Sequence, residues 1–155
     1  MITHEPKDYI CPMCKMANKE PDETNKPEYI VYENEHTLAY ISPKWWKNNP
    51  GHVLVIPKQH TENIYTISDE LHGEVYKTAK KIALALKIAY QCDGTSTRQH
   101  NEPAGNQGVW HLHVHVFPRY ENDELYKNYD KKRWPGHDEK MQFVSKLKKY
   151  FSENS

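Results

Sequence analysis

The stretch HLHVHVFPR, residues 111–119, places three histidines at alternate positions with aliphatic residues between them. A spacing of two brings side chains onto one face of a β-strand, ~6.6 Å apart at a rise of ~3.3 Å per residue, whereas a helix would scatter them. The pattern therefore predicts a strand over residues 109–117. Three imidazoles in a dry core would need partners, so the face that carries His111, His113 and His115 should border a cleft.

The sequence on both sides of this strand predicts further strands and two helices. Residues 29–32 and 37–41 form a predicted hairpin, and residues 52–56, rich in β-branched side chains, form a central strand. Over residues 68–91 apolar side chains recur every three or four positions, which predicts the longest helix, and residues 141–151 suggest a C-terminal one. Turn-forming residues mark the expected loops at residues 1–27, 42–51 and 93–108. This order of elements predicts an α+β domain built on an antiparallel sheet.

The composition limits the class of protein. A chain of 155 residues has the size of one domain, and its 21 lysines and arginines balance 21 aspartates and glutamates. No global positive field therefore favours a long nucleic acid as partner. No apolar run approaches the ~20 residues of a membrane span, and residues 1–14 lack the apolar core of a signal peptide. We expect a cytoplasmic protein that does not bind a membrane.

A row of imidazoles suits two kinds of chemistry. Neutral histidines could together hold one catalytic metal ion that activates water, or one imidazole could attack phosphorus while its neighbours hold its tautomer and assist the leaving group. Hydrolytic metal sites for phosphates usually include carboxylates, and the twenty residues around this row contain only Glu102 and Glu121. Their scarcity favours attack by histidine.

The pair Cys11 and Cys14 has the C-x2-C spacing that suits a metal ion or a redox couple, and two ordinary reduced thiols are a third interpretation. Three cysteines in the chain are too few for a disulfide framework. A thioredoxin-like redox motif opens a helix after a strand, whereas this pair precedes the first predicted strand. The redox interpretation is therefore disfavoured.

Three motifs together carry a resemblance to a known family. The stretch HLHVHVF is similar to the signature of the histidine triad (HIT) nucleotide hydrolases and transferases. NNPGHVLVIPKQH, residues 48–60, resembles the first active-site strand of that family, and STRQHNEPAGNQGVW, residues 96–110, resembles the loop before the triad in bacterial members of the dinucleoside polyphosphate hydrolase type. The resemblance runs from about residue 11 to residue 120.

This resemblance implies a HIT-like fold with an antiparallel sheet of about five strands, one long helix and a C-terminal helix. It implies a single HIT domain over residues 1–155, with a loop-rich, zinc-binding N-terminus at residues 1–27 and a C-terminal extension at residues 121–155. The expected assembly is a homodimer formed through the long helix. Aromatic residues of the extension, Tyr126, Tyr129 and Trp134, would reach a partner's pocket or pack locally.

The resemblance also assigns roles to individual residues. His113 would attack the α-phosphorus and become a nucleotidyl-histidine, while His115 would bind the phosphate or bridging oxygen and help to protonate the leaving group, and His52 would complete the relay. Cys11, Cys14, His60 and His111 would hold a structural zinc ion, and Mg²⁺ bound with the substrate is the other candidate cofactor. Eight further residues are candidates for contact with the substrate: Asn101 and Gln107 for the α-phosphate and leaving group, Gly108 and Val109 as N–H donors, Arg98 and Arg119 for a longer polyphosphate, and Ile41 and Leu54 for the base.

The expected function is hydrolysis of dinucleoside polyphosphates, such as diadenosine tetraphosphate, with release of a nucleoside monophosphate. Three alternatives stay open at this point. They are an adenosine phosphoramidase, a nucleotide-binding module without turnover, and an enzyme in which all three triad histidines bind one catalytic metal.

Overall fold

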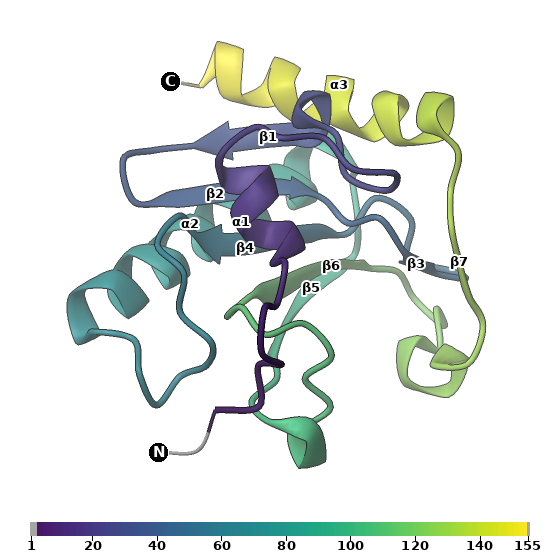
Figure 1. Ribbon diagram of the computed structural model, residues 1–155. Helices are drawn as coiled ribbons and strands as arrows, with labels where there is room; N and C mark the ends of the chain where they lie inside the picture. Colours follow the sequence, from purple (N-terminus) through teal and green to yellow (C-terminus); the bar gives the residue numbers. More distant parts are fainter. Residues whose placement is uncertain (1–2, 155) are drawn as a thin grey trace.

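The computed structural model describes residues 3–154 and contains a five-stranded antiparallel sheet (Figure 1). Its strand order is β1-β2-β4-β6-β5, and a separate two-stranded ribbon joins β3 to β7. The strands are β1 (Ile30–Glu33), β2 (Thr37–Ile41), β3 (Trp45–Trp46), β4 (Val53–Pro57), β5 (Gly94–Gln99), β6 (Val114–Arg119) and β7 (Lys132–Arg133). The predicted α+β architecture with five strands in its main sheet is confirmed.

Helices cover both faces of the sheet. The short α1 lies in front of it and the long α2 behind it (Figure 1). α2 packs against β4 and β6, and α3 packs against β1 and α2. The helices are α1 (Pro12–Ala17), α2 (Asp69–Ala89) and α3 (His137–Glu153), with short 3-10 helices at Pro27–Tyr29, Pro103–Gly105 and Leu125–Asn128. Within residues 3–154, the helices lack an apolar stretch long enough to cross a bilayer.

The predicted long helix begins and ends where its sequence signals lie. The hydroxyl oxygen of Ser68 accepts the N–H of Leu71 and caps the first turn, where Asp69 and Glu70 also favour the positive end of the helix dipole. One face of the helix is buried against the sheet, through Val75, Thr78, Ala79, Ile82, Ala85 and Leu86. The 3.6-residue period of the sequence therefore corresponds to a real packing face.

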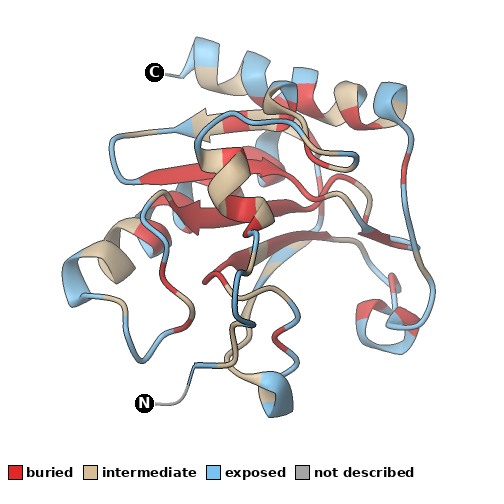
Figure 2. Cartoon of the chain, viewed as in Figure 1, coloured by how far each residue is buried: buried red, intermediate tan, exposed pale blue. Residues whose placement is uncertain are grey.

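The centre of the sheet is the best buried part of the molecule, as Figure 2 shows. Every residue of β2 and of β4 is buried, because α2 covers one face while the N-terminal segment and the pocket walls cover the other. His52, which precedes β4, is reached through a tight turn at Gly51, whose φ of +74° suits glycine. A side chain there would also collide with the ring of Phe143.

Three details of the sequence-based prediction are wrong. Within residues 1–27, of which 1–2 lie outside the described part, α1 forms because Pro12 opens the helix and the Cys11 sulfur accepts the Cys14 N–H. Within residues 42–51, the two tryptophans of β3 pair with β7. Within residues 93–108, β5 forms as a polar edge strand. In β5, backbone hydrogen bonds to β6 form a strand although its side chains gave little sign of one.

The triad strand is also shorter than predicted, because β6 starts at Val114 and not at residue 109. The backbone just before it bonds elsewhere: the N–H of Leu112 donates to the carbonyl oxygen of Thr61 at 2.6 Å. His111 and His113 therefore precede the ladder, and only His115 lies within it.

Candidate functional site

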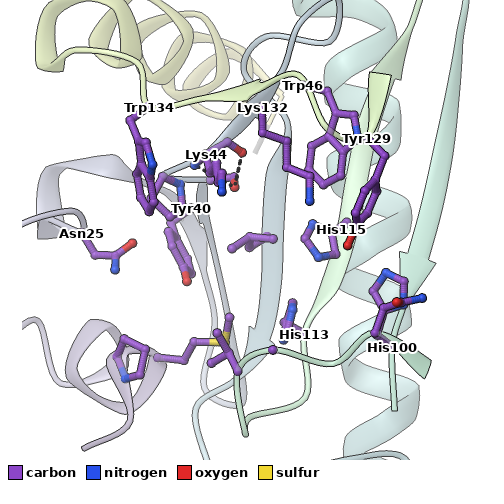
Figure 3. A pocket seen from close by; sticks show the side chains of 18 residues that line it. Asn25, Tyr40, Lys44, Trp46, His100, His113, His115, Tyr129, Lys132 and Trp134 are labelled. Carbon is purple, nitrogen blue, oxygen red and sulfur yellow. Dashed lines mark hydrogen bonds between the residues drawn. The ribbon is translucent and has the colours of Figure 1, made fainter. Parts of the chain in front are cut away.

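A pocket of about 410 Å³ opens on the face of the sheet that α1 covers in part (Figure 3). His113 and His115 lie on one side of it, and Tyr40 and Asn25 lie across from them (Figure 3). Its remaining walls include five aromatic or cationic side chains from residues 44–46 and 129–134, namely Lys44, Trp46, Tyr129, Lys132 and Trp134. The lining contains two lysines and no carboxylate, so it suits an anionic ligand with an apolar part.

One ring nitrogen of His113 is hydrogen-bonded to the backbone, and the other is free to react. Its Nδ1 lies 2.7 Å from the carbonyl oxygen of His111, and because a carbonyl can only accept, Nδ1 carries the hydrogen. Burial lowers the pKa of His113 below the usual 6.5, so the ring is neutral at neutral pH. Nε2 therefore keeps its lone pair, on a residue that lines the pocket.

His115 forms a pair with His52. The Nδ1 of His115 lies 3.3 Å from the Nε2 of His52, and the His52 ring stacks on Phe117 with centroids 4.5 Å apart. Burial and nearby positive charge lower the pKa of His52 to about 3, and burial likewise holds the pKa of His115 well below 6.5. Both rings are neutral, so one hydrogen lies between them and the tautomer of one ring dictates that of the other.

A second cluster lies at the N-terminal end of α1. The sulfurs and ring nitrogens of Cys11, Cys14, His60 and His111 all lie within 4.8 Å of one another. The Nδ1 of His111 lies 3.4 Å from the Cys11 sulfur and 3.6 Å from that of Cys14, and the Nδ1 of His60 lies 3.2 Å from the Cys14 sulfur. Tetrahedral zinc with bonds of ~2.0–2.3 Å separates its ligand atoms by ~3.3–3.8 Å, so the donor set fits this ion.

The outer nitrogens of both histidines are also occupied. The Nε2 of His111 lies 2.9 Å from the carbonyl oxygen of Pro57, and the Nε2 of His60 lies 2.8 Å from a carboxylate oxygen of Glu5. The carbonyl acceptor fixes the hydrogen of His111 on Nε2 and leaves a bare Nδ1 facing the sulfurs, as the outer partners of metal-bound histidines do. The ion-pair contact with Glu5 favours the same arrangement in His60. Burial, with the neighbouring Cys11, raises the pKa of Cys14 to about 12, so a cation would have to displace the thiol proton.

His111 thus faces the cysteines, away from the other two triad histidines. Within residues 3–154, a metal-ligating group combining His111, His113 and His115 does not occur. This arrangement disfavours a single catalytic metal held by all three.

Of the eight positions predicted to contact substrate, the structure brings three to the pocket: Leu54, Gly108 and Val109. Ile41 is fully buried and outside the lining, because its neighbour Tyr40 takes the pocket face of β2. Asn101 and Gln107 instead order the preceding loop. The Oδ1 of Asn101 accepts the N–H of Ile64, and Gln107 bonds to the backbone of Glu102 and Val109.

The two predicted arginines lie outside the pocket lining. The guanidinium of Arg98 lies about 5 Å from the ring centroids of Trp46 and Phe117. Arg119 forms an ion pair with Asp123 at 2.7 Å, and that carboxylate accepts further hydrogen bonds that hold its pKa well below the usual range. The charge of Arg119 is thus already compensated within the protein.

Sequence reasoning missed several pocket residues, of which Asn25 has an unmet hydrogen-bonding capacity. Its Nδ2 donates to the carboxylate of Asp22, so its buried Oδ1 is the free acceptor, and this atom has no partner within residues 3–154. Tyr129 and Trp134, named in the sequence analysis only as aromatic residues of the C-terminal extension, line the pocket of their own chain. Lys132 and His100 also line the pocket, and neither was predicted.

Comparison with known proteins places these features in a family. The HIT domain model matches residues 23–122. A protein of Bacillus subtilis called protein hit is 39% identical over 94 residues, 61% of this chain, and the match spans 63% of that protein, less than two thirds of its length. An uncharacterized HIT-like protein of Borreliella burgdorferi is 38% identical over 74% of this chain and 79% of its own. A bis(5'-adenosyl)-triphosphatase of Dictyostelium discoideum is 30% identical over 81% of this chain and 87% of its own.

Solved structures agree with the sequence matches. A Hit-like protein from Bartonella henselae superposes with a TM-score of 0.77 at 32% identity, covering 91% of this chain and 96% of that one. A zinc-bound histidine triad family protein from Mycobacterium smegmatis superposes with a TM-score of 0.73 at 25% identity, covering 92% and 96%.

Proposed function

The chain belongs to the HIT domain family, and we propose that its pocket hydrolyses nucleotides at the α-phosphate through a nucleotidyl-histidine intermediate. The observation that carries this proposal is the fixed tautomer of His113. A neutral imidazole whose Nδ1 is tied to the His111 carbonyl, 2.7 Å away, has a lone pair on Nε2 before substrate arrives. Attack then needs no separate base.

In the proposed first step, Nε2 of His113 forms a bond to the α-phosphorus while the bond from phosphorus to the leaving group breaks. The ring becomes positively charged, and the carbonyl of His111 stabilises its Nδ1–H. A phosphate leaving group departs as an anion. Water then attacks the phosphorus, the P–N bond breaks, His113 returns to its neutral form, and a nucleoside monophosphate and a proton are released.

His115 and His52 assist the leaving group in this proposal. We assign the shared hydrogen to Nε2 of His52, so that Nδ1 of His115 accepts it and Nε2 of His115 carries a hydrogen toward the pocket. That N–H donates to the bridging oxygen as charge develops on it. His52 acts through His115 and is therefore a positioning residue.

Zinc is proposed for the cluster of Cys11, Cys14, His60 and His111. The pairwise distances, the two occupied Nε2 atoms and the zinc-bound relative support this assignment. With four protein ligands the ion would have no open position, and it would join the N-terminal segment to the triad loop. Its role would be to hold the backbone of His111, whose carbonyl fixes His113.

For the substrate we propose dinucleoside polyphosphates such as diadenosine tetraphosphate. The cationic lining and the named activity of the Dictyostelium relative favour this class. An adenosine phosphoramidate is the second candidate, since the same attack at phosphorus would cleave its P–N bond. Mg²⁺ bound with the substrate, a homodimer and a cytoplasmic location stay predictions.

Turnover of both substrate classes by the wild type and by His113→Ala tests the proposal. We expect loss of several orders of magnitude with His113→Ala, since the nucleophile is removed. The matched control is His36→Ala, which removes an exposed histidine outside the pocket lining. Equal rates for His113→Ala and wild type would refute the assigned nucleophile, and binding without turnover by the wild type would favour a nucleotide-binding module.

A further inference from the structure

Residues 129–134, which we call the strap, form one wall of the pocket. The strap is held in place by β7, in which Lys132 pairs with Trp46 and Arg133 with Trp45 of β3. Figure 3 shows Lys132 reaching from the strap toward His115. A segment from the C-terminal part of the chain thus supplies a cation to the side of the pocket where the histidines lie.

The ammonium of Lys132 has aromatic neighbours and lacks an acidic partner. Its Nζ lies 3.6 Å from the ring centroid of Tyr129 and 4.5 Å from that of Trp46, contacts that hold the cation by attraction to the ring faces. Within residues 3–154 it forms neither a hydrogen bond nor an ion pair, and the pocket lining contains no carboxylate. Its three N–H donors are therefore available to a ligand.

The position of this cation complements the proposed reaction. The ring of Trp46 that holds it lies 6.2 Å, centroid to centroid, from the ring of His115. With the α-phosphorus at His113 and the bridging oxygen at His115, the next phosphate would lie on the side of Lys132. Arg98 and Arg119, which the sequence suggested for this role, are outside the lining, and Arg119 is paired with Asp123. The second lysine of the lining, Lys44, lies 5.4 Å from the ring centroid of Trp134.

We infer that Lys132 binds the phosphates beyond the α-phosphate, and that it makes the pocket selective for a phosphate-chain leaving group over a neutral amine. This inference rests on the proposed function, because it takes the α-phosphate to lie at His113. It adds a specificity residue from the C-terminal extension that acts within the same chain.

Binding of adenosine mono-, di- and triphosphate, measured by calorimetry, tests it directly. The measurements use His113→Ala as background, so that turnover cannot change the ligand. They compare this variant with the double variant that also carries Lys132→Met. Methionine keeps an unbranched apolar stem against the two rings but removes the charge. We expect the Kd of the triphosphate to rise about tenfold, as for loss of a charge-assisted contact, with a much smaller change for the monophosphate.

Two control variants accompany this series. Lys131→Met removes the neighbouring, exposed lysine outside the lining and should leave all three Kd values unchanged. Lys132→Arg keeps the charge and should retain tighter binding of the triphosphate. An equal rise in Kd for mono- and triphosphate with Lys132→Met, or no rise for either, would overturn the inference.

A kinetic arm separates this inference from the proposed function. With His113 intact, Lys132→Met should lower the ratio of kcat/KM for diadenosine tetraphosphate over adenosine phosphoramidate about tenfold. An unchanged ratio would refute the role of Lys132 even if both substrates are turned over. Full activity of His113→Ala would instead refute the proposed function, while the binding series would still report on Lys132.

Discussion

The buried imidazole of His52 predicts a specific dependence of stability on pH. His52 is fully buried, and burial together with the positive charges of Arg98 and Lys132 lowers its pKa from 6.5 to about 3. The unfolded chain therefore binds a proton at this residue at a pH where the folded chain does not. The folded state is stabilised above pH 6.5, and this stabilisation is lost progressively as the pH falls from 6.5 toward 3.

The size of the effect follows from the two pKa values. At pH 7 the imidazole of His52 is largely neutral in both states, whereas at pH 5 it is almost fully protonated in the unfolded chain and neutral in the folded chain. Linkage then gives a loss of about 2 kcal/mol of unfolding free energy between pH 7 and pH 5. The substitution His52→Phe keeps a ring of similar shape against Phe117 but removes this titration.

Urea unfolding followed by tryptophan fluorescence at both pH values, in saturating zinc, measures this loss. Wild type should lose about 2 kcal/mol more than His52→Phe between pH 7 and pH 5, while His36→Gln, at an exposed histidine, should behave as wild type. Losses of equal size in wild type and His52→Phe would show that His52 titrates alike in the folded and unfolded states.

Three further predictions concern the turn before β4, the metal cluster and the long helix. Thermal unfolding should show that Gly51→Ala, at a φ of +74°, is destabilised by about 1–3 kcal/mol. Gly73→Ala, in α2 with open space around it, should instead be stabilised by about 1 kcal/mol. Destabilisation of similar size in both variants would show that the turn at Gly51 is not strained by a side chain. Metal analysis of purified protein should find about one zinc per chain, lost in Cys14→Ala with a fall in Tm, and equal zinc in both proteins would remove the site. Light scattering should find a dimer that Leu84→Glu with Ile88→Glu converts to a monomer, since these α2 side chains are 51% and 62% exposed; an unchanged mass would reject that interface.

Elements with a strong side-chain period were predictable from the sequence. The predicted helix over residues 68–91 corresponds to α2, Asp69–Ala89, because its apolar face packs on the sheet. β5 was missed because it is an edge strand of glycine and polar residues, held by backbone hydrogen bonds to β6. α1 was missed because six residues carry too little periodicity to register.

Some residues of the candidate site were predictable from local sequence motifs, and others were not. The triad histidines and the four candidate zinc ligands lie in short motifs, so the sequence could indicate them, and the structure brings those four candidates together. The wall formed by Tyr129, Lys132 and Trp134 depends on pairing between β3 and β7, which are far apart in the chain. No local pattern encodes such a contact. The sequence could therefore name Tyr129 and Trp134 only as aromatic residues of the extension, and it gave no sign of Lys132.

The proposed mechanism requires the Nε2 of His113 to become bonded to phosphorus during turnover. Quenching the reaction with diadenosine tetraphosphate in alkaline denaturant and mapping the labelled peptide by mass spectrometry would detect this bond. We expect an adenylyl group on His113 that appears before product and disappears as substrate is exhausted. An adduct on another residue, or product formed with no adduct at any time, would rule out His113 as the nucleophile.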